Sequence, residues 1–130
     1  MSNLSLAGWL ERLEQLHPSA IDLGLNRCGE VARRLDLVDT GIITATVAGT
    51  NGKGTTVAVM ESVLCASGVH CGAFTSPHLI RFNERIRVDG QEVSDETIIA
   101  AFEAIERARE EISLTYFEFG ALAALWIFKT

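Results

Sequence analysis

The sequence has no excess of basic residues, no long apolar run and no low-complexity tract. Its 130 residues contain 11 lysines and arginines against 17 aspartates and glutamates, so the net charge is -6. This balance argues against a general nucleic-acid-binding protein, because such proteins neutralise phosphates with basic side chains. The longest apolar run, residues 121–128, is far too short to cross a bilayer. The N-terminal residues also lack a basic stretch ahead of an apolar one, so we find no secretory signal.

Cysteine is scarce as well. The three cysteines, Cys28, Cys65 and Cys71, make an odd number, and none of them stands in a C-x-x-C motif. This usage is typical of buried or half-buried thiols in a reducing compartment. Together with the missing secretory signal, it predicts a cytoplasmic protein.

The hydrophobic content is high enough for a folded core. Hydrophobic residues make up 48% of the chain, and its length suggests one domain or part of one. The chain ends at Thr130 directly after an apolar helical run, with no capping glycine or polar tail. We therefore expect it to be the N-terminal piece of a longer protein.

The apolar pattern predicts an α/β fold. Strands are expected at 42–48 and 69–75, with a glycine-rich loop and a helix over 55–67 between them, which together would form a right-handed parallel βαβ unit. A hairpin should follow, because Asp89 and Gly90 form a strong turn signal. Further helices are expected at 6–16, 28–37 and 95–111, and after a Thr115–Glu118 capping box.

The glycine-rich loop, VAGTNGKGTT at residues 47–56, differs from the usual P-loop G-x-x-x-x-G-K-[ST]. Gly54 follows Lys53 where a hydroxyl residue is expected, and Thr55 comes one position late. Val47 stands where the first glycine belongs. The spacing therefore indicates a phosphate-binding loop of a different kind.

The chemistry of this loop fits a nucleotide phosphate. Its glycines let backbone amides approach an anion without Cβ clashes. Lys53 supplies a mobile positive charge for the β- and γ-phosphates, and Thr55 or Thr56 could reach Mg²⁺. The alternative is a tight turn with only a structural role.

Five separated motifs resemble, in their order, those of the bifunctional dihydrofolate synthase/folylpolyglutamate synthase family of the Mur-type ligase superfamily. They are IDLGLNR (21–27), AGTNGKGTT (48–56), TSPHL (75–79), RFNERIRV (81–88) and SLTYFEFGALAAL (113–125). The resemblance implies a P-loop-containing parallel sheet with flanking helices. Residues 1–130 would be the N-terminal part of this ATP-binding domain, with the rest of it and a C-terminal domain absent from the chain.

The resemblance also implies an activity. Members of this family are ATP- and Mg²⁺-dependent ligases of folate biosynthesis and one-carbon metabolism. They activate a carboxylate as an acyl phosphate and join L-glutamate to dihydropteroate, or to tetrahydrofolate polyglutamates. A monomer with small-molecule partners (dihydropteroate, folates and L-glutamate), and no nucleic acid or membrane, would be expected.

Site residues follow from the same resemblance, position by position. The ATP-phosphate loop matches Gly49, Thr50, Asn51, Gly52, Lys53, Gly54 and Thr55, with Lys53 as the catalytic cation. Ser76 matches a Mg²⁺ ligand. The pterin-binding positions match Gln15, Leu16, His17 and Pro18, together with Thr115, Tyr116, Phe117 and Glu118.

Simpler interpretations remain open for several of these residues. Ser76 with Pro77 also fits an ordinary helix start, Pro18 a helix stop, and Phe117 and Phe119 core positions. Arg85 and Arg87 could face a polyanionic substrate together, or could protect a solvated strand edge.

Two other functions compete with the ligase. A generic P-loop hydrolase or small-molecule kinase is one, although Gly54 after Lys53 argues against it. A nucleotide-binding interaction module without catalysis is the other.

Overall fold

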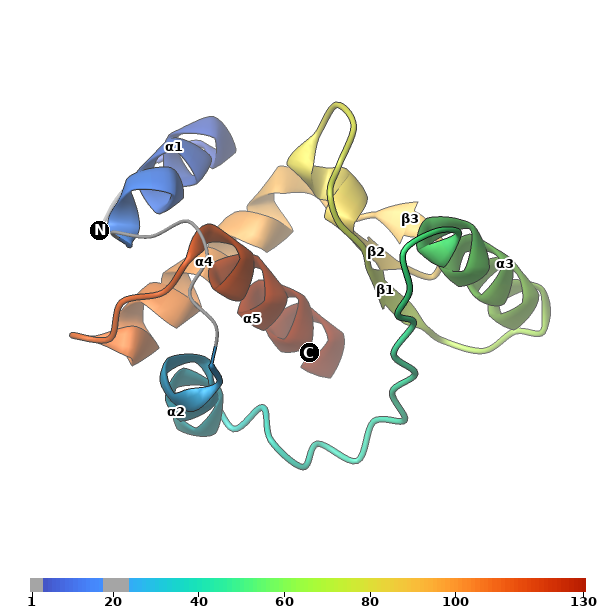
Figure 1. The fold of residues 1–130 in the computed structure, drawn as a ribbon, viewed down its shortest axis with the longest axis horizontal. Coiled ribbons are helices and arrows are strands. Elements are labelled where there is room, and N and C mark those ends of the chain that lie inside the picture. The colour runs from blue at the N-terminus through green and yellow to red at the C-terminus, as the bar shows by residue number, and fades with distance from the viewer. Residues whose placement is uncertain (1–3, 18–23) are drawn as a thin grey trace. The chain divides into compact units, whose positions relative to one another are not determined.

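The structure, a computed structural model, describes residues 4–17 and 24–130 (Figure 1). The chain divides into two compact units. The first combines Met1–Gly41 with Asp95–Thr130, and the second is Ile42–Ser94. In the described part of the chain, no helix has the length and apolar content that a membrane crossing needs.

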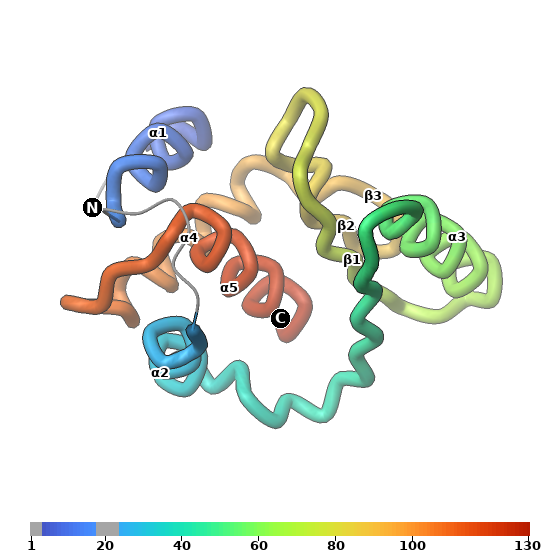
Figure 2. The backbone as a smooth tube through the Cα atoms, viewed as in Figure 1, coloured from blue at the N-terminus to red at the C-terminus, as the bar shows by residue number. Residues whose placement is uncertain are grey.

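The first unit is helical. It contains α1 (Leu6–Leu16), α2 (Asn26–Arg34), α4 (Asp95–Arg109) and α5 (Tyr116–Lys129). Helices α4 and α5 pack against each other, and both α1 and α2 contact this pair (Figure 2). The helices predicted at 6–16, 28–37 and 95–111 are confirmed, the last two with boundaries shifted by two or three residues.

An aromatic cluster forms the centre of this unit. Trp9, Phe102 and Phe119 are fully buried, and their ring centroids lie 5.5 to 6.4 Å apart. Trp9 lies on one face of α1 with Leu6 and Leu13, as the helical spacing predicts. The Ser5 side chain caps the helix by accepting a hydrogen bond from the Gly8 amide.

The second unit pairs one helix with a small sheet. It contains α3 (Lys53–Ala66), β1 (Gly72–Phe74), a 3₁₀ turn η1 (Phe82–Arg85), β2 (Ile86–Val88) and β3 (Gln91–Glu92). The strands lie in the order β1-β2-β3, and both pairs are antiparallel. The hairpin turn is confirmed: Asp89 and Gly90 both have positive φ, 53° and 82°, as a type I′ turn requires.

The strand predicted at 42–48 is not formed, and this part of the prediction is wrong. Residues 42–48 have no regular structure, and Ile43 is 99% exposed. A strand of a parallel sheet is stabilised by neighbours on both sides, and no described segment pairs with these residues. The parallel βαβ unit is therefore absent from the described residues, and the sheet that is present is antiparallel.

The two arginines of the RFNERIRV motif have partners within the unit. Arg85 lies in η1 and donates from Nε to His78 Nδ1 at 2.8 Å. Arg87 lies on β2, the central strand, and forms an ion pair with Glu61 of α3 at 3.0 Å. These contacts support neither of the two interpretations given above, in which the arginines protect a sheet edge or face an anionic substrate together. Arg87 instead fastens α3 to the sheet.

We predict that Trp9 is the main anchor of α1. Trp9→Ala should lower the free energy of unfolding by about 3–5 kcal/mol, the usual loss for a large buried aromatic. Trp9→Phe should cost only about 1 kcal/mol, because it keeps most of the packing and removes the indole Nε1–H, which has no hydrogen-bond partner among the described residues. Urea unfolding followed by far-ultraviolet circular dichroism measures both. Glu14→Ala, on the exposed face of α1, is the control, and equal losses in Trp9→Ala and Glu14→Ala would contradict the prediction.

Candidate functional site

The glycine-rich loop leads directly into α3. Gly49 and Gly52 have φ values of 152° and 76°, which other residues rarely adopt. Gly52 is the N-cap of the helix, and Lys53 is its first residue. Residues 48–56 are all exposed. The loop therefore presents its backbone and the Lys53 side chain to solvent.

The first turn of α3 has amide groups without acceptors in the helix. Its first helical hydrogen bond runs from the Thr56 amide to the Gly52 carbonyl, at 2.9 Å. The amides of the three preceding residues have no such acceptor, and no side chain caps this end. Together with the positive end of the helix dipole, these amides form a site that suits an anion.

Nothing in the described part of the chain requires glycine at position 54. Its φ is not positive, and a Cβ added there would meet no atom within 4 Å. Glycine in a helix costs about 1 kcal/mol relative to alanine. The open space above its backbone is consistent with a ligand that approaches closely.

Ser76 lies in the same unit, two residues after β1 ends. It is exposed, and no helix begins at Ser76–Pro77, so the interpretation as a helix start is wrong. The following turn is held by Glu84, whose carboxylate accepts hydrogen bonds from the amides of Leu79, Ile80 and Arg81. These bonds, chiefly those from Arg81 and Leu79, lower the pKa of Glu84.

The segment that carries Ser76 is tied to α3 through Arg87. Besides its ion pair with Glu61, Arg87 donates to the Thr75 hydroxyl at 3.3 Å and to the Glu84 carbonyl at 2.6 Å. Both side chains of the ion pair are largely buried, with 19% and 12% exposure. Arg87 thus connects the helix that follows the glycine loop with the residues on both sides of Ser76.

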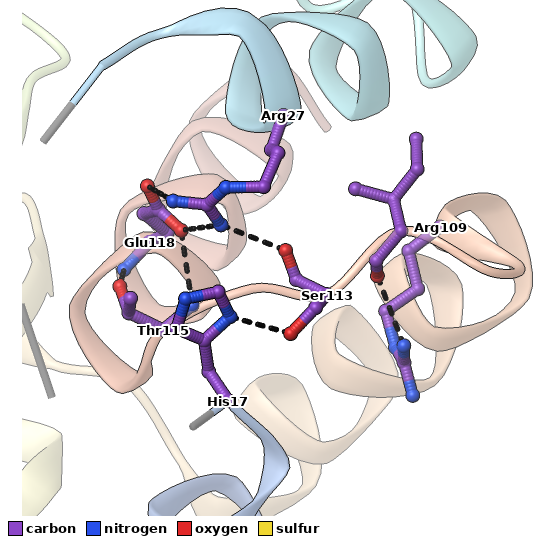
Figure 3. Close-up of polar contacts among 7 residues, drawn as sticks. His17, Arg27, Arg109, Ser113, Thr115 and Glu118 are labelled. Atoms are coloured by element: carbon purple, nitrogen blue, oxygen red, sulfur yellow. Dashed lines mark hydrogen bonds and ion pairs between the residues drawn. The ribbon is translucent and has the colours of Figure 1, made fainter. Parts of the chain in front are cut away.

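A second polar cluster lies in the helical unit, around the N-terminus of α5 (Figure 3). Thr115 and Glu118 form the predicted capping box, with bonds of 2.9 and 3.1 Å. Arg27 of α2 binds both carboxylate oxygens of Glu118, at 2.7 and 3.0 Å, and also donates to the Ser113 carbonyl. His17 completes the cluster with a hydrogen bond between Nδ1 and the Ser113 hydroxyl.

The predicted pterin-binding positions are only partly brought together. His17 joins Thr115 and Glu118 in the cluster of Figure 3, but the acceptor oxygens of Glu118 already bind Arg27 and the Thr115 amide. Tyr116 is half-buried. Phe117 is 51% exposed, so the interpretation of Phe117 as a core residue is wrong.

The other predicted pterin positions lie elsewhere. Gln15 and Leu16 line an open depression of about 450 Å³ along α1, together with Leu4, Gly8, Glu11 and Arg12. Pro18 lies outside the described residues.

Two residues of the cluster were missed by reasoning from the sequence. Arg27 and Ser113 are far apart in the chain, and neither has a catalytic spacing of its own. Each does lie at one end of a quoted motif, Arg27 at the end of IDLGLNR and Ser113 at the start of SLTYFEFG. That position was the signal that could have identified them.

The comparisons in sequence give a consistent set of relatives. No protein-family profile matches the chain. The chain is 54% identical over 124 residues to the dihydrofolate synthase/folylpolyglutamate synthase of Escherichia coli K12, a match that covers 95% of this chain and 29% of that protein. The corresponding protein of Haemophilus influenzae is 48% identical over 124 residues, with 95% and 28% covered.

Solved structures show the same relationship. E. coli FolC in complex with DHPP and ADP has a TM-score of 0.95 at 53% identity, covering 98% of this chain and 31% of that one. The bifunctional folylpolyglutamate synthase/dihydrofolate synthase of Yersinia pestis, complexed with AMPPNP and Mn, has a TM-score of 0.92 at 51% identity, with the same coverage. The folylpolyglutamate synthetase of Lactobacillus casei has a TM-score of 0.83 at 27% identity, covering 96% of this chain and 33% of that one.

These similarities in sequence and structure define the class of protein. The chain has the α/β fold of part of a Mur-ligase-like enzyme, which confirms the predicted α/β class but not the parallel sheet. Over the residues that it spans, it belongs to the bifunctional dihydrofolate synthase/folylpolyglutamate synthase family, as its motifs indicate. It spans a little under 30% of the length of these two curated relatives, at 29% and 28%.

We predict that Arg27 stabilises the start of α5 by neutralising Glu118. The Glu118 side chain is only 11% exposed, so Arg27→Ala would leave a nearly buried carboxylate without its cation. We expect a loss of about 2–3 kcal/mol in the free energy of unfolding. Adding Glu118→Gln should recover part of this loss, because glutamine removes the charge and still completes the capping box.

Urea unfolding of these variants tests the Arg27 prediction. Arg33→Ala is the matched control, because Arg33 pairs with Glu30 on the exposed surface of the same helix and should change stability by less than about 0.5 kcal/mol. A loss for Arg27→Ala no larger than that of the control would refute the role given to Arg27.

Proposed function

We propose that the protein to which this chain belongs is an ATP-dependent amide ligase of folate biosynthesis. It would join L-glutamate to dihydropteroate, and to tetrahydrofolate polyglutamates, through an acyl-phosphate intermediate. The observation that carries this proposal is the exposed glycine loop at the start of α3, where uncapped amides and Lys53 stand together. Solved relatives that bind ADP or AMPPNP support it.

The proposed reaction needs the groups that this loop supplies. A carboxylate is a poor electrophile, and transfer of the ATP γ-phosphoryl group makes it an acyl phosphate. The amine of glutamate then attacks the acyl carbon, and phosphate leaves as the amide forms. Negative charge spreads over phosphoryl oxygens during the first step, so the Lys53 ammonium and the amides of Gly52 to Thr55 would stabilise it.

Mg²⁺ would be held partly by Ser76. The ion neutralises phosphate charge when bound, and it prefers oxygen ligands while keeping several waters. An exposed serine hydroxyl in the same unit as the loop suits this role. The described residues contain no group of three or more His, Cys, Asp or Glu side chains that could hold a metal. Ser76 would therefore act with phosphate oxygens, water and ligands outside the described residues.

The pterin would contact the region around the N-terminus of α5. Phe117 offers a half-exposed aromatic face, on which a flat ring can stack. His17, fixed by Ser113, and Tyr116 lie in the same unit and could supply hydrogen bonds. Because Glu118 is engaged by Arg27 and the Thr115 amide, we assign Thr115 and Glu118 a positioning role for this segment. Gln15 and Leu16, which face a separate depression, are the weaker members of the predicted set.

The same proposal also implies a compartment, an oligomeric state and a place for this chain in the whole protein. The protein would act as a cytoplasmic monomer on small molecules. Residues 1–130 would form the N-terminal part of its ATP-binding domain, and this piece alone would bind nucleotide weakly without turnover.

ADP release by the full-length protein tests the proposed function. Three mixtures are compared: ATP and Mg²⁺ alone, the same with dihydropteroate and L-glutamate, and the same with tetrahydrofolate and L-glutamate. We expect ADP only when a pterin carboxylate and glutamate are both present. ADP release without either carboxylate would favour the generic P-loop hydrolase or kinase, and no release at all would favour the non-catalytic module.

The chain offers a matched pair of lysines for the same assay. Lys53 and Lys129 are its two lysines. Lys53→Ala should lower the rate of ADP release by about 100-fold or more, because it removes a cation placed at developing charge. Lys129→Ala should leave the rate within about twofold, since Lys129 pairs with Asp36 at an exposed surface. Equal effects of the two substitutions would contradict the role of Lys53.

A further inference from the structure

Two of the three cysteines lie side by side in the second unit. Cys65 lies near the end of α3, and Cys71 immediately precedes β1. Their Sγ atoms are 3.8 Å apart. Both residues are half-buried, and both are free thiols in this structure.

The turn between them fixes this proximity. Gly68 has a φ of 78°, and the amides of Gly68 and Val69 bond back to the carbonyls of Cys65 and Leu64, at 3.1 and 3.0 Å. This is a helix C-terminal motif that reverses the chain tightly. Cys71 is held in addition through its amide, which donates to the Asp89 carboxylate at 3.0 Å. Both thiols are therefore placed by backbone hydrogen bonds of the fold.

A small molecule can reach Cys65. Cys65 lines an open depression of about 340 Å³ together with Gly68, Val69, His70 and Asp89. Asp89, which pairs with His70, and Glu61, which pairs with Arg87, both act electrostatically on Cys71. Burial, the hydrogen bond with Cys65 and these negative charges raise the pKa of the Cys71 thiol.

We propose that Cys65 and Cys71 form a reversible disulfide on exposure to hydrogen peroxide. The proposal does not depend on the proposed ligase function. It rests on the 3.8 Å separation of the sulfur atoms, the turn that fixes them and the depression that Cys65 lines.

The chemistry balances with one molecule of peroxide. One thiolate attacks a peroxide oxygen, so that an S–O bond forms as the O–O bond breaks, and the departing hydroxide takes up the proton lost by the thiol. The second thiol then attacks the sulfenic sulfur. An S–S bond forms, the S–O bond breaks, and the leaving hydroxide takes the second thiol proton to give water. Two thiols are oxidised, and one peroxide is reduced to two waters.

The bond would join the last turn of α3 to the start of β1. Lys53 and the glycine loop lie at the opposite end of the same 14-residue helix. Nucleotide binding should therefore persist after oxidation.

Differential alkylation of the full-length protein tests this modification. The protein is treated with hydrogen peroxide, its free thiols are blocked with N-ethylmaleimide, and the product is reduced and labelled with a heavy form of the reagent. Peptide mass spectrometry then measures the ratio of light to heavy label at each cysteine. We expect Cys65 and Cys71 to take the heavy label in equal proportion, and a cross-linked peptide containing both to appear before reduction.

Cys28 provides the internal control. It belongs to the other unit and so has no part in the turn that places the pair, and it should keep the light label. Cys65→Ser and Cys71→Ser should each abolish heavy labelling of the remaining partner, whereas Cys28→Ser should leave the pair unaffected. The proposal is overturned if Cys65 and Cys71 keep the light label, if either pairs with another cysteine, or if they oxidise irreversibly without cross-linking.

Discussion

The start of α3 imposes the constraint on which the rest of the candidate site depends. A helix leaves its first amides without partners, and the chain must supply acceptors or leave them to solvent or a ligand. At α1 and α5 the chain supplies them, through Ser5 and through Thr115 with Glu118. At α3 it places glycines and a lysine instead, with no side-chain cap. The open amides, Lys53 and the unexplained Gly54 are therefore parts of one arrangement that suits phosphate.

In each unit, a largely buried arginine–glutamate pair links the elements that carry the candidate site residues. Arg87 and Glu61 fasten α3 to the sheet next to the Ser76 segment. Arg27 and Glu118 fasten α2 to the start of α5, where the aromatic residues of the proposed pterin region begin. Arg27, Arg87 and Glu118 each also bond to a backbone group, as nearly buried charges must. The charged residues of the quoted motifs thus serve the architecture as much as the chemistry.

How much of this structure can be predicted from the sequence depends on how far apart the interacting residues lie along the chain. The Asp89-Gly90 turn and the Thr115–Glu118 capping box are local, and both are confirmed. The strand at 42–48 depends on neighbours in a sheet, and the prediction fails where none are described. The pairing of Arg27 with Glu118 crosses 91 positions, and no local spacing reveals it. Motif resemblance identified the loop and the family, but it could not separate binding residues from positioning ones.

The most direct test of the account is whether the amides at the start of α3 bind nucleotide phosphate. Backbone amide chemical shifts of the full-length protein are recorded with and without Mg²⁺ and ADP. The change in shift at each residue shows which amides contact the nucleotide. We expect large shifts for residues 49–55 and little change at the start of α1 and α5, whose caps are filled from within the chain. Unchanged shifts in the loop under saturating nucleotide would contradict it.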